Sequence, residues 1–355
     1  MASFSTTTEP SSRAAAQADV TNVIAESSLL DGTGQIIDFP ASPPSLGDVL
    51  SLPPQELSRF SLDFLNLLCA SGLPDTADLN IDACLKTLAG WTEHVRQETE
   101  RNLGRFHRDP EPYRHSEAYY RVLMMVTVLQ QDCGVRYDPD CIKSPLFLNS
   151  GEGFLHGLLA GQANGTCANL PVLYAAIGRR LGYPIYLCLA RRHVFCRWTT
   201  KDMRERFNIE GSGVGLSTPE DDYYLTWPQA ISPREVQLGH FLRNLDPQEE
   251  LAMFMATRGH CLLDRGHLSE AIVAYAHAHR LAPADPHYFS FLLGAINQEM
   301  QERHEGKIPS SYREAEVFRR PGTPKLVQYV LNDRFPRIDK QQIDPTIRGQ
   351  TASKD

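Results

Sequence analysis

The spacing of apolar residues changes at Gly182, and this change most constrains the fold. Before it, residues 165–181 carry leucine and isoleucine at intervals of three and four, which is typical of a helix with one buried stripe. After it, the segments YPIYLCLA (183–190) and HVFCRWTT (193–200) are rich in β-branched and aromatic residues, which favours strands. A helix followed by two strands with a tight connection predicts an α+β core, one helix packed on a small antiparallel sheet.

Two more strands are expected after this pair. RFNIEGSGVG (206–215) has a strand-like start and a glycine-rich end, and DDYYLTWP (221–228) is aromatic. Trp227 and the pair Tyr223–Tyr224 are expected to lie in the core or in the wall of a cleft.

The composition of the chain divides it into five regions. The predicted regions are a disordered segment 1–45, a helical region 46–145, the α+β core 146–245, a second helical region 246–305, and a C-terminal extension 306–355 whose end is also disordered. Within 46–145, helices are predicted over 53–72, 81–103 and 116–134, with Ser116 as an N-cap.

The second helical region has the spacing of a tetratricopeptide-type hairpin. Its small, aromatic and proline positions are occupied by Gly259, Ala271, Tyr275, Ala278 and Pro283. Only one such unit is visible, whereas a stable array needs about three. We therefore expect this hairpin to be docked on the rest of the chain.

Composition and charge exclude several classes of function. A net charge of -8 argues against a nucleic-acid-binding protein. The start of the chain lacks a secretory signal, and no apolar run approaches the roughly 18–20 residues that span a bilayer, so we expect a cytoplasmic protein without membrane contact. The eight cysteines include no C-x-x-C pair, which indicates reduced thiols and no zinc site. No cofactor or metal is implied.

Cys167 lies where the predicted helix of residues 167–181 would begin. A cysteine attacks as its thiolate, and a free thiol has a pKa of about 8.5. The positive end of a helix dipole and a paired histidine both lower that pKa. His193, at the start of a predicted strand, can supply the histidine.

A histidine used in this way needs an acceptor on its other ring nitrogen. Asn208 is the best placed candidate, and Glu210, two residues on and so on the same face of a strand, is its rival. For an oxyanion hole, the backbone N–H of Cys167 is one expected donor. Gln162 and Asn164 compete for the second position, and Gly165 would allow a substrate to approach closely.

The stretches GQANGTCANLPVLYAAIGRRLGYPIYL, RRHVFCRW and ERFNIEG together resemble the bacterial transglutaminase-like core family over about residues 150–245, and loosely through 300. The resemblance implies a papain/transglutaminase-like fold, with Cys167 as nucleophile and His193 as base. The third position falls on Asn208, where many relatives have aspartate. A tetratricopeptide-like module follows the core in some members.

Two functions are consistent with these features. The first is a cysteine enzyme that performs acyl transfer, or amide or peptide hydrolysis, on a protein or peptide substrate through a thioester on Cys167. The second is a catalytically inactive scaffold whose helical modules bind a protein partner.

Overall fold

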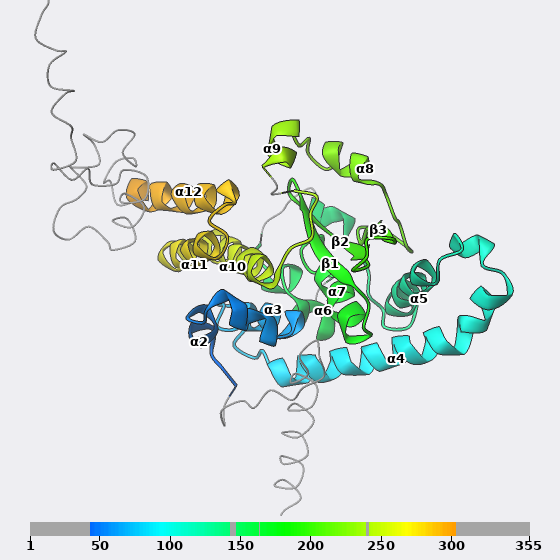
Figure 1. Cartoon of the computed structure of the whole chain (residues 1–355). Coiled ribbons are helices and arrows are strands. Elements are labelled where there is room, and N and C mark those ends of the chain that lie inside the picture. The colour runs from blue at the N-terminus through cyan, green and yellow to red at the C-terminus, as the bar shows by residue number, and fades with distance from the viewer. Residues whose placement is uncertain (1–42, 143–146, 163, 239–240, 303–355) are drawn as a thin grey trace, which may run out of the picture.

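The structure, a computed structural model, describes residues 43–142, 147–162, 164–238 and 241–302. The predictions made for residues 1–42 and 303–355 lie outside these described residues. In Figure 1 a small sheet lies at the centre of the molecule, with α7 behind it, α4 and α5 on one side and α10, α11 and α12 on the other.

The sheet has the three-stranded antiparallel order β1-β2-β3. Its strands are β1 (Ile185–Ala190), β2 (His193–Thr199) and β3 (Arg206–Ile209). Ala190 pairs with His193, so the Arg191–Arg192 connection is a two-residue turn, and Arg192 adopts a φ of 59°. The α+β class is therefore confirmed, with the first three predicted strands in place.

The helix α7 (Leu170–Arg180) lies against the sheet and is buried over most of its length. It ends as the sequence predicts, because Gly182 has a φ of 78° and the Tyr183 N–H donates to the Gly178 carbonyl at 2.8 Å. Its start differs from the prediction. The chain makes a turn at residues 167–169 before the helix begins at Leu170, so Cys167 precedes the helix by three residues.

The two faces of the sheet serve different neighbours. One face packs with α7 in the main core and carries Ile185, Leu187, Cys196, Trp198 and Ile209. The other face forms a second cluster, with Cys188, Ala190 and Phe195 from the strands and Tyr224, Ile231 and Phe241 from the chain that follows them. The polar side chains of the candidate site lie on this second face.

The fourth predicted strand is wrong, because residues 221–226 form a helix. The second face is covered by α8 (Asp221–Thr226) and α9 (Pro233–Gln237), seen at the top of Figure 1. Asp221 and Asp222 lie in the first turn of α8, where negative charge stabilises a helix. The burial of Tyr224 against the sheet then outweighs the strand preference of the aromatic residues.

The helices predicted within residues 46–145 are present, with one of them divided. This region contains the α-helices α2 (Leu46–Leu50), α3 (Leu62–Ala70), α4 (Ile81–Arg108) and α5 (Glu117–Gln131), and the 3-10 helices Pro54–Arg59, Glu111–Tyr113 and Pro139–Ile142. The 3-10 helix Ser150–Glu152 and α6 (Leu155–Leu159) follow in the region predicted as the core. The helix expected over 53–72 is a 3-10 helix followed by α3. Ser116 caps α5 by accepting from the Tyr119 N–H at 2.9 Å.

The second helical region comprises α10 (Pro247–Asp264), α11 (Leu268–Leu281) and α12 (Pro286–Glu302). The α10–α11 hairpin is confirmed as a structure, whereas its family remains a prediction. It docks on the rest of the chain as expected, because the Arg258 guanidinium on α10 donates to the carbonyls of Cys69 and Ser71 at 2.7 and 2.8 Å. Among the described helices, none is both long and apolar enough to cross a bilayer.

The hairpin depends on a glycine in α10, which gives the first testable prediction. A Cβ at Gly259 would lie 2.4 Å from the Tyr275 ring, so Gly259→Ala should lower the free energy of unfolding by about 1–3 kcal/mol. Gly294→Ala on α12 is the matched control, because nothing lies within 4 Å of its Cβ and alanine favours a helix. Urea unfolding would measure both, and equal stability of the two variants would contradict the prediction.

Candidate functional site

A tight turn directly ahead of α7 holds Cys167. The Thr166 N–H donates to Asn169 Oδ1 at 2.8 Å, and the Asn169 amide donates to the Gly151 carbonyl at 2.9 Å. Asn169 is fully buried, whereas Cys167 is partly exposed. The turn therefore fixes the backbone on each side of a thiol that solvent can reach.

Gly165 is explained by packing within the protein. A Cβ at this position would lie 2.3 Å from Leu170 Cγ, and the backbone pairs with the segment before it, since the Gly165 N–H donates to the Arg136 carbonyl at 2.6 Å. The missing side chain at Gly165 thus allows the close approach of Leu170, and its role towards a substrate stays a prediction.

His193 is the first residue of β2, and its side chain is almost fully buried. Its Nε2 lies 2.8 Å from Oε2 of Glu210. Burial alone would lower the pKa of the imidazole, but hydrogen bonds to Cys167 and Glu210, with their charges, raise that pKa to about 9. The structure thus brings Cys167, His193 and Glu210 together.

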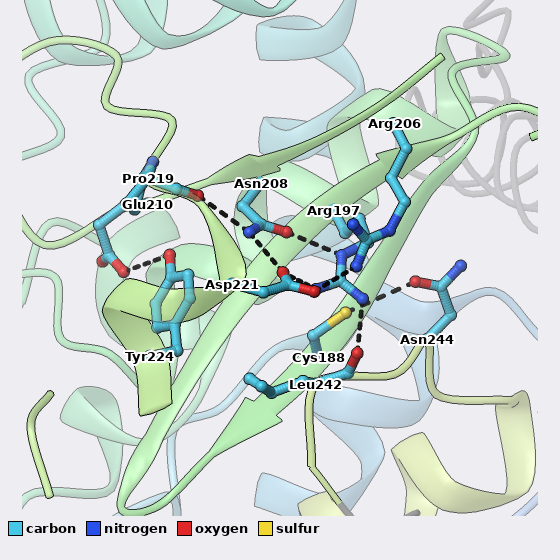
Figure 2. A network of polar contacts seen from close by, with 10 residues as sticks. All are labelled: Cys188, Arg197, Arg206, Asn208, Glu210, Pro219, Asp221, Tyr224, Leu242 and Asn244. Atoms are coloured by element: carbon cyan, nitrogen blue, oxygen red, sulfur yellow. Dashed lines mark hydrogen bonds and ion pairs between the residues drawn. The ribbon is translucent and has the colours of Figure 1, made fainter. Parts of the chain in front are cut away.

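Glu210 follows β3 directly and is held by four hydrogen bonds within the described chain. Besides His193, the Ser212 N–H and Oγ donate to Oε1 at 2.7 and 2.6 Å. The Tyr224 hydroxyl donates to Oε2 at 2.9 Å, and Figure 2 shows this contact. Burial would raise the pKa of Glu210, but the donors and the charge of His193 lower it overall. Glu210 is therefore a buried carboxylate at neutral pH.

Asn208 does not contact His193, which corrects its assignment as the third member. It lies on the same face of the sheet as Glu210, but β-pairing sets it opposite Arg197, four residues along β2 from His193. Its Oδ1 accepts from Arg197 Nε at 2.7 Å, and its amide donates to the Pro219 carbonyl at 2.9 Å and to Asp221 Oδ1 at 2.8 Å. The acceptor that the structure places next to the His193 ring is the other candidate, Glu210.

Asn208 instead belongs to a buried network around Arg197, shown in Figure 2. Arg197, which is 2% exposed, donates to Asn208, to the Leu242 carbonyl at 2.7 Å and to Asp221 at 2.6 Å. Arg206 binds the other oxygen of Asp221 at 2.6 Å. Since Asp221 is the first residue of α8, the network ties α8 to β2 and β3.

Aromatic rings cover His193. Trp227 lies edge-on to the imidazole at 4.7 Å between ring centroids, and the Tyr224 ring lies at 6.0 Å. Tyr224 is fully buried and stacks on Phe195 at 3.9 Å, whereas Tyr223 is 41% exposed. The expectation of core and cleft-wall positions is confirmed for Tyr224, and Trp227 forms a half-buried wall next to the histidine.

Gln162 and Asn164 are exposed and line a cavity of about 240 Å³ that also includes Cys133 and Arg136. The lining of this cavity does not include Cys167. A second cavity, of about 750 Å³, lies around the other end of α7 near Arg180. The role of either amide in an oxyanion hole therefore stays a prediction.

Sequence reasoning missed Ser212 and Tyr224 as partners of the site. Ser212 carried no sequence signal, because the side chains that commonly bond the backbone two residues on are Asn, Asp, Ser and Thr, whereas the acceptor here is Glu210. The contact of Tyr224 with Glu210 could not be expected either, because it depends on a helix at residues 221–226, where the sequence predicts a strand.

Within the part of the chain that the structure describes, no group of three or more His, Cys, Asp or Glu side chains could hold a metal ion. Comparisons with protein-family models, curated proteins and solved structures find no match for this chain.

The network around Arg197 gives the second prediction. Asn208→Ala would leave the buried Arg197 Nε without its acceptor, so the free energy of unfolding should fall by about 2–3 kcal/mol. Asn102→Ala on α4 is the matched control, because that amide bonds Glu98 one helical turn away and should cost less than about 1 kcal/mol. Urea unfolding measures both, and a loss at Asn208 no larger than at Asn102 would refute the role of the network.

Proposed function

We propose that this chain is a transglutaminase-like cysteine enzyme that performs acyl transfer, or amide or peptide hydrolysis, through a thioester on Cys167. The observation that supports the proposal is a buried His193 that contacts both a partly exposed thiol and a buried carboxylate. This is the arrangement of an activated nucleophile, its base and a group that orients the base.

Each residue has a role in the proposed reaction. Since Nε2 of His193 binds Glu210, Nδ1 is the nitrogen left for the thiol. The thiol proton moves to Nδ1, and the thiolate attacks the acyl carbon. The departing amine takes that proton as the C–N bond breaks, which leaves a thioester. Water or a second amine then attacks the thioester, gives its proton to Nδ1, and releases the acyl product as the thiolate leaves.

The start of α7 supports this chemistry. Cys167 lies ahead of the N-terminus of a helix of eleven residues, where the helix dipole stabilises negative charge on a thiolate and on an oxyanion. The proposed substrate is a protein or peptide. The alternative, an inactive scaffold, needs no reactive thiol, so the reactivity of Cys167 separates the two functions.

The third prediction tests that reactivity. We expect Cys167 to react with iodoacetamide at pH 7 at least about tenfold faster than Cys133, because His193, whose pKa is raised to about 9, is protonated there and stabilises the thiolate through their hydrogen bond. In His193→Ala the labelling rate of Cys167 should fall about tenfold or more. Mass spectrometry of the labelled peptides would measure both rates.

Cys133 is an internal control in the same experiment. It is also partly exposed, but burial, together with the charge of Asp132, raises the pKa of its thiol to about 11. A labelling rate at Cys167 that is no faster than at Cys133 and that His193→Ala leaves unchanged would eliminate the enzyme and favour the scaffold.

The fourth prediction separates Glu210 from its neighbours. Glu210→Gln removes the charge that stabilises the imidazolium, so the labelling rate of Cys167 at pH 6.5 should fall about tenfold or more. Glu220→Gln, an exposed change just before α8, should leave this rate unaltered. Equal rates in Glu210→Gln and the wild type would show that the carboxylate does not act on His193.

A further inference from the structure

Two donors share one oxygen of Glu210. His193 Nε2 lies 2.8 Å from Oε2, and the Tyr224 hydroxyl donates to that same atom at 2.9 Å. The other oxygen, Oε1, is occupied by the N–H and hydroxyl of Ser212. Tyr224 therefore competes with His193 for the negative charge on Oε2.

The structure holds the Tyr224 hydroxyl firmly in this position. Its ring is fully buried and stacks on Phe195 from β2 at 3.9 Å. The start of its helix is fixed by Asp221, which binds Arg197 and Arg206. In Figure 2 the hydroxyl points towards Glu210 from the helix side of the site.

We propose that Tyr224 is a positioning residue that limits how strongly Glu210 holds the proton of His193. The inference rests on the proposed function in taking His193 as the base of the reaction. A base must both accept and release a proton, and a carboxylate with an unshared oxygen would hold the imidazolium too tightly for easy release. Tyr224 acts through Glu210 and does not touch the thiol in this scheme.

The other titratable groups near the pair do not replace Tyr224. Burial raises the pKa of Tyr174 on α7 to about 12, and burial also raises the pKa of Cys196 on β2, so both remain neutral at neutral pH. Tyr223 on α8 is likewise neutral, since burial and the charge of Glu210 raise its pKa. Cys167, from the turn before α7, hydrogen-bonds to His193 and not to Glu210 among the contacts described.

The direction of the effect distinguishes positioning from simple support. Removing the hydroxyl in Tyr224→Phe keeps the stacked ring but leaves Oε2 to His193 alone, so the imidazolium is stabilised and the pKa of His193 rises. A residue that only supported the fold would, when altered, admit water to the site. The pKa of His193 would then fall towards its ordinary value of about 6.5.

The experiment is an NMR titration of the full-length chain carrying ¹³C-labelled histidine, with the His193 signal assigned from its loss in His193→Gln. Tyr224→Phe should raise the pKa of His193 by roughly 0.5–1 unit. Tyr223→Phe, the same chemical change one residue away, should leave it unchanged. An unchanged or lowered value in Tyr224→Phe would overturn the inference.

Ser212→Ala provides a second variant if Tyr224→Phe does not fold. It removes the hydroxyl donor to Oε1 while its backbone N–H remains, so the pKa of His193 should again rise, and a fall or no change would overturn the competition between donors. Iodoacetamide labelling of the same samples tests the proposed function separately. If Cys167 is unreactive but the pKa of His193 rises in Tyr224→Phe, the enzyme alone is refuted. If Cys167 is reactive but the pKa of His193 does not rise in Tyr224→Phe, the role of Tyr224 alone is refuted.

Discussion

A carboxylate that is buried as deeply as Glu210 must be surrounded by donors, because an unpaired charge in a protein interior is very costly. Its donors come from three separate places: the first residue of β2, the turn after β3, and α8. Satisfying this one charge therefore requires the sheet and α8 to come together. The same requirement places His193 where the Cys167 thiol, from the turn ahead of α7, can contact it.

The two faces of the sheet differ in what they carry: one packs in the main core, and the other carries the polar residues of the candidate site. The face towards α7 is apolar and belongs to the main core, whereas the other face carries His193, Arg197 and Asn208 under α8. Arg197 and Glu210 are alike in being buried charges with full sets of partners, and α8 contributes to both sets through Asp221 and Tyr224. This helix of six residues is thus held by polar contacts at its start and by stacking in its middle.

The sequence predicts the parts of the structure that local physics decides. Strand-forming residues and the left-handed Gly182 place β1, β2 and the end of α7 correctly. The strand prediction for residues 221–226 is wrong because aromatic side chains favour strands locally, whereas the helix is stabilised by the burial of Tyr224 against the sheet. Asn208 and Glu210 are two residues apart in extended chain and lie on the same side of the sheet, so alternation cannot choose between them. Their pairing register with β2 decides, and that register is a tertiary property.

The two connections between the strands of the sheet differ in how closely they bear on the candidate site. The Arg191–Arg192 turn directly precedes His193, and in a two-residue hairpin the loop length sets the register of both strands. A one-residue slip of this register would turn the imidazole to the face occupied by Val194 and leave Glu210 without its ring partner. The connection at 200–205 runs from the end of β2 to the start of β3, at the end of the sheet away from His193, and it is mostly exposed. The geometry of the site thus depends on the strand register at the end of the sheet where His193 lies, whereas none of Cys167, His193 and Glu210 lies in the connection at the other end.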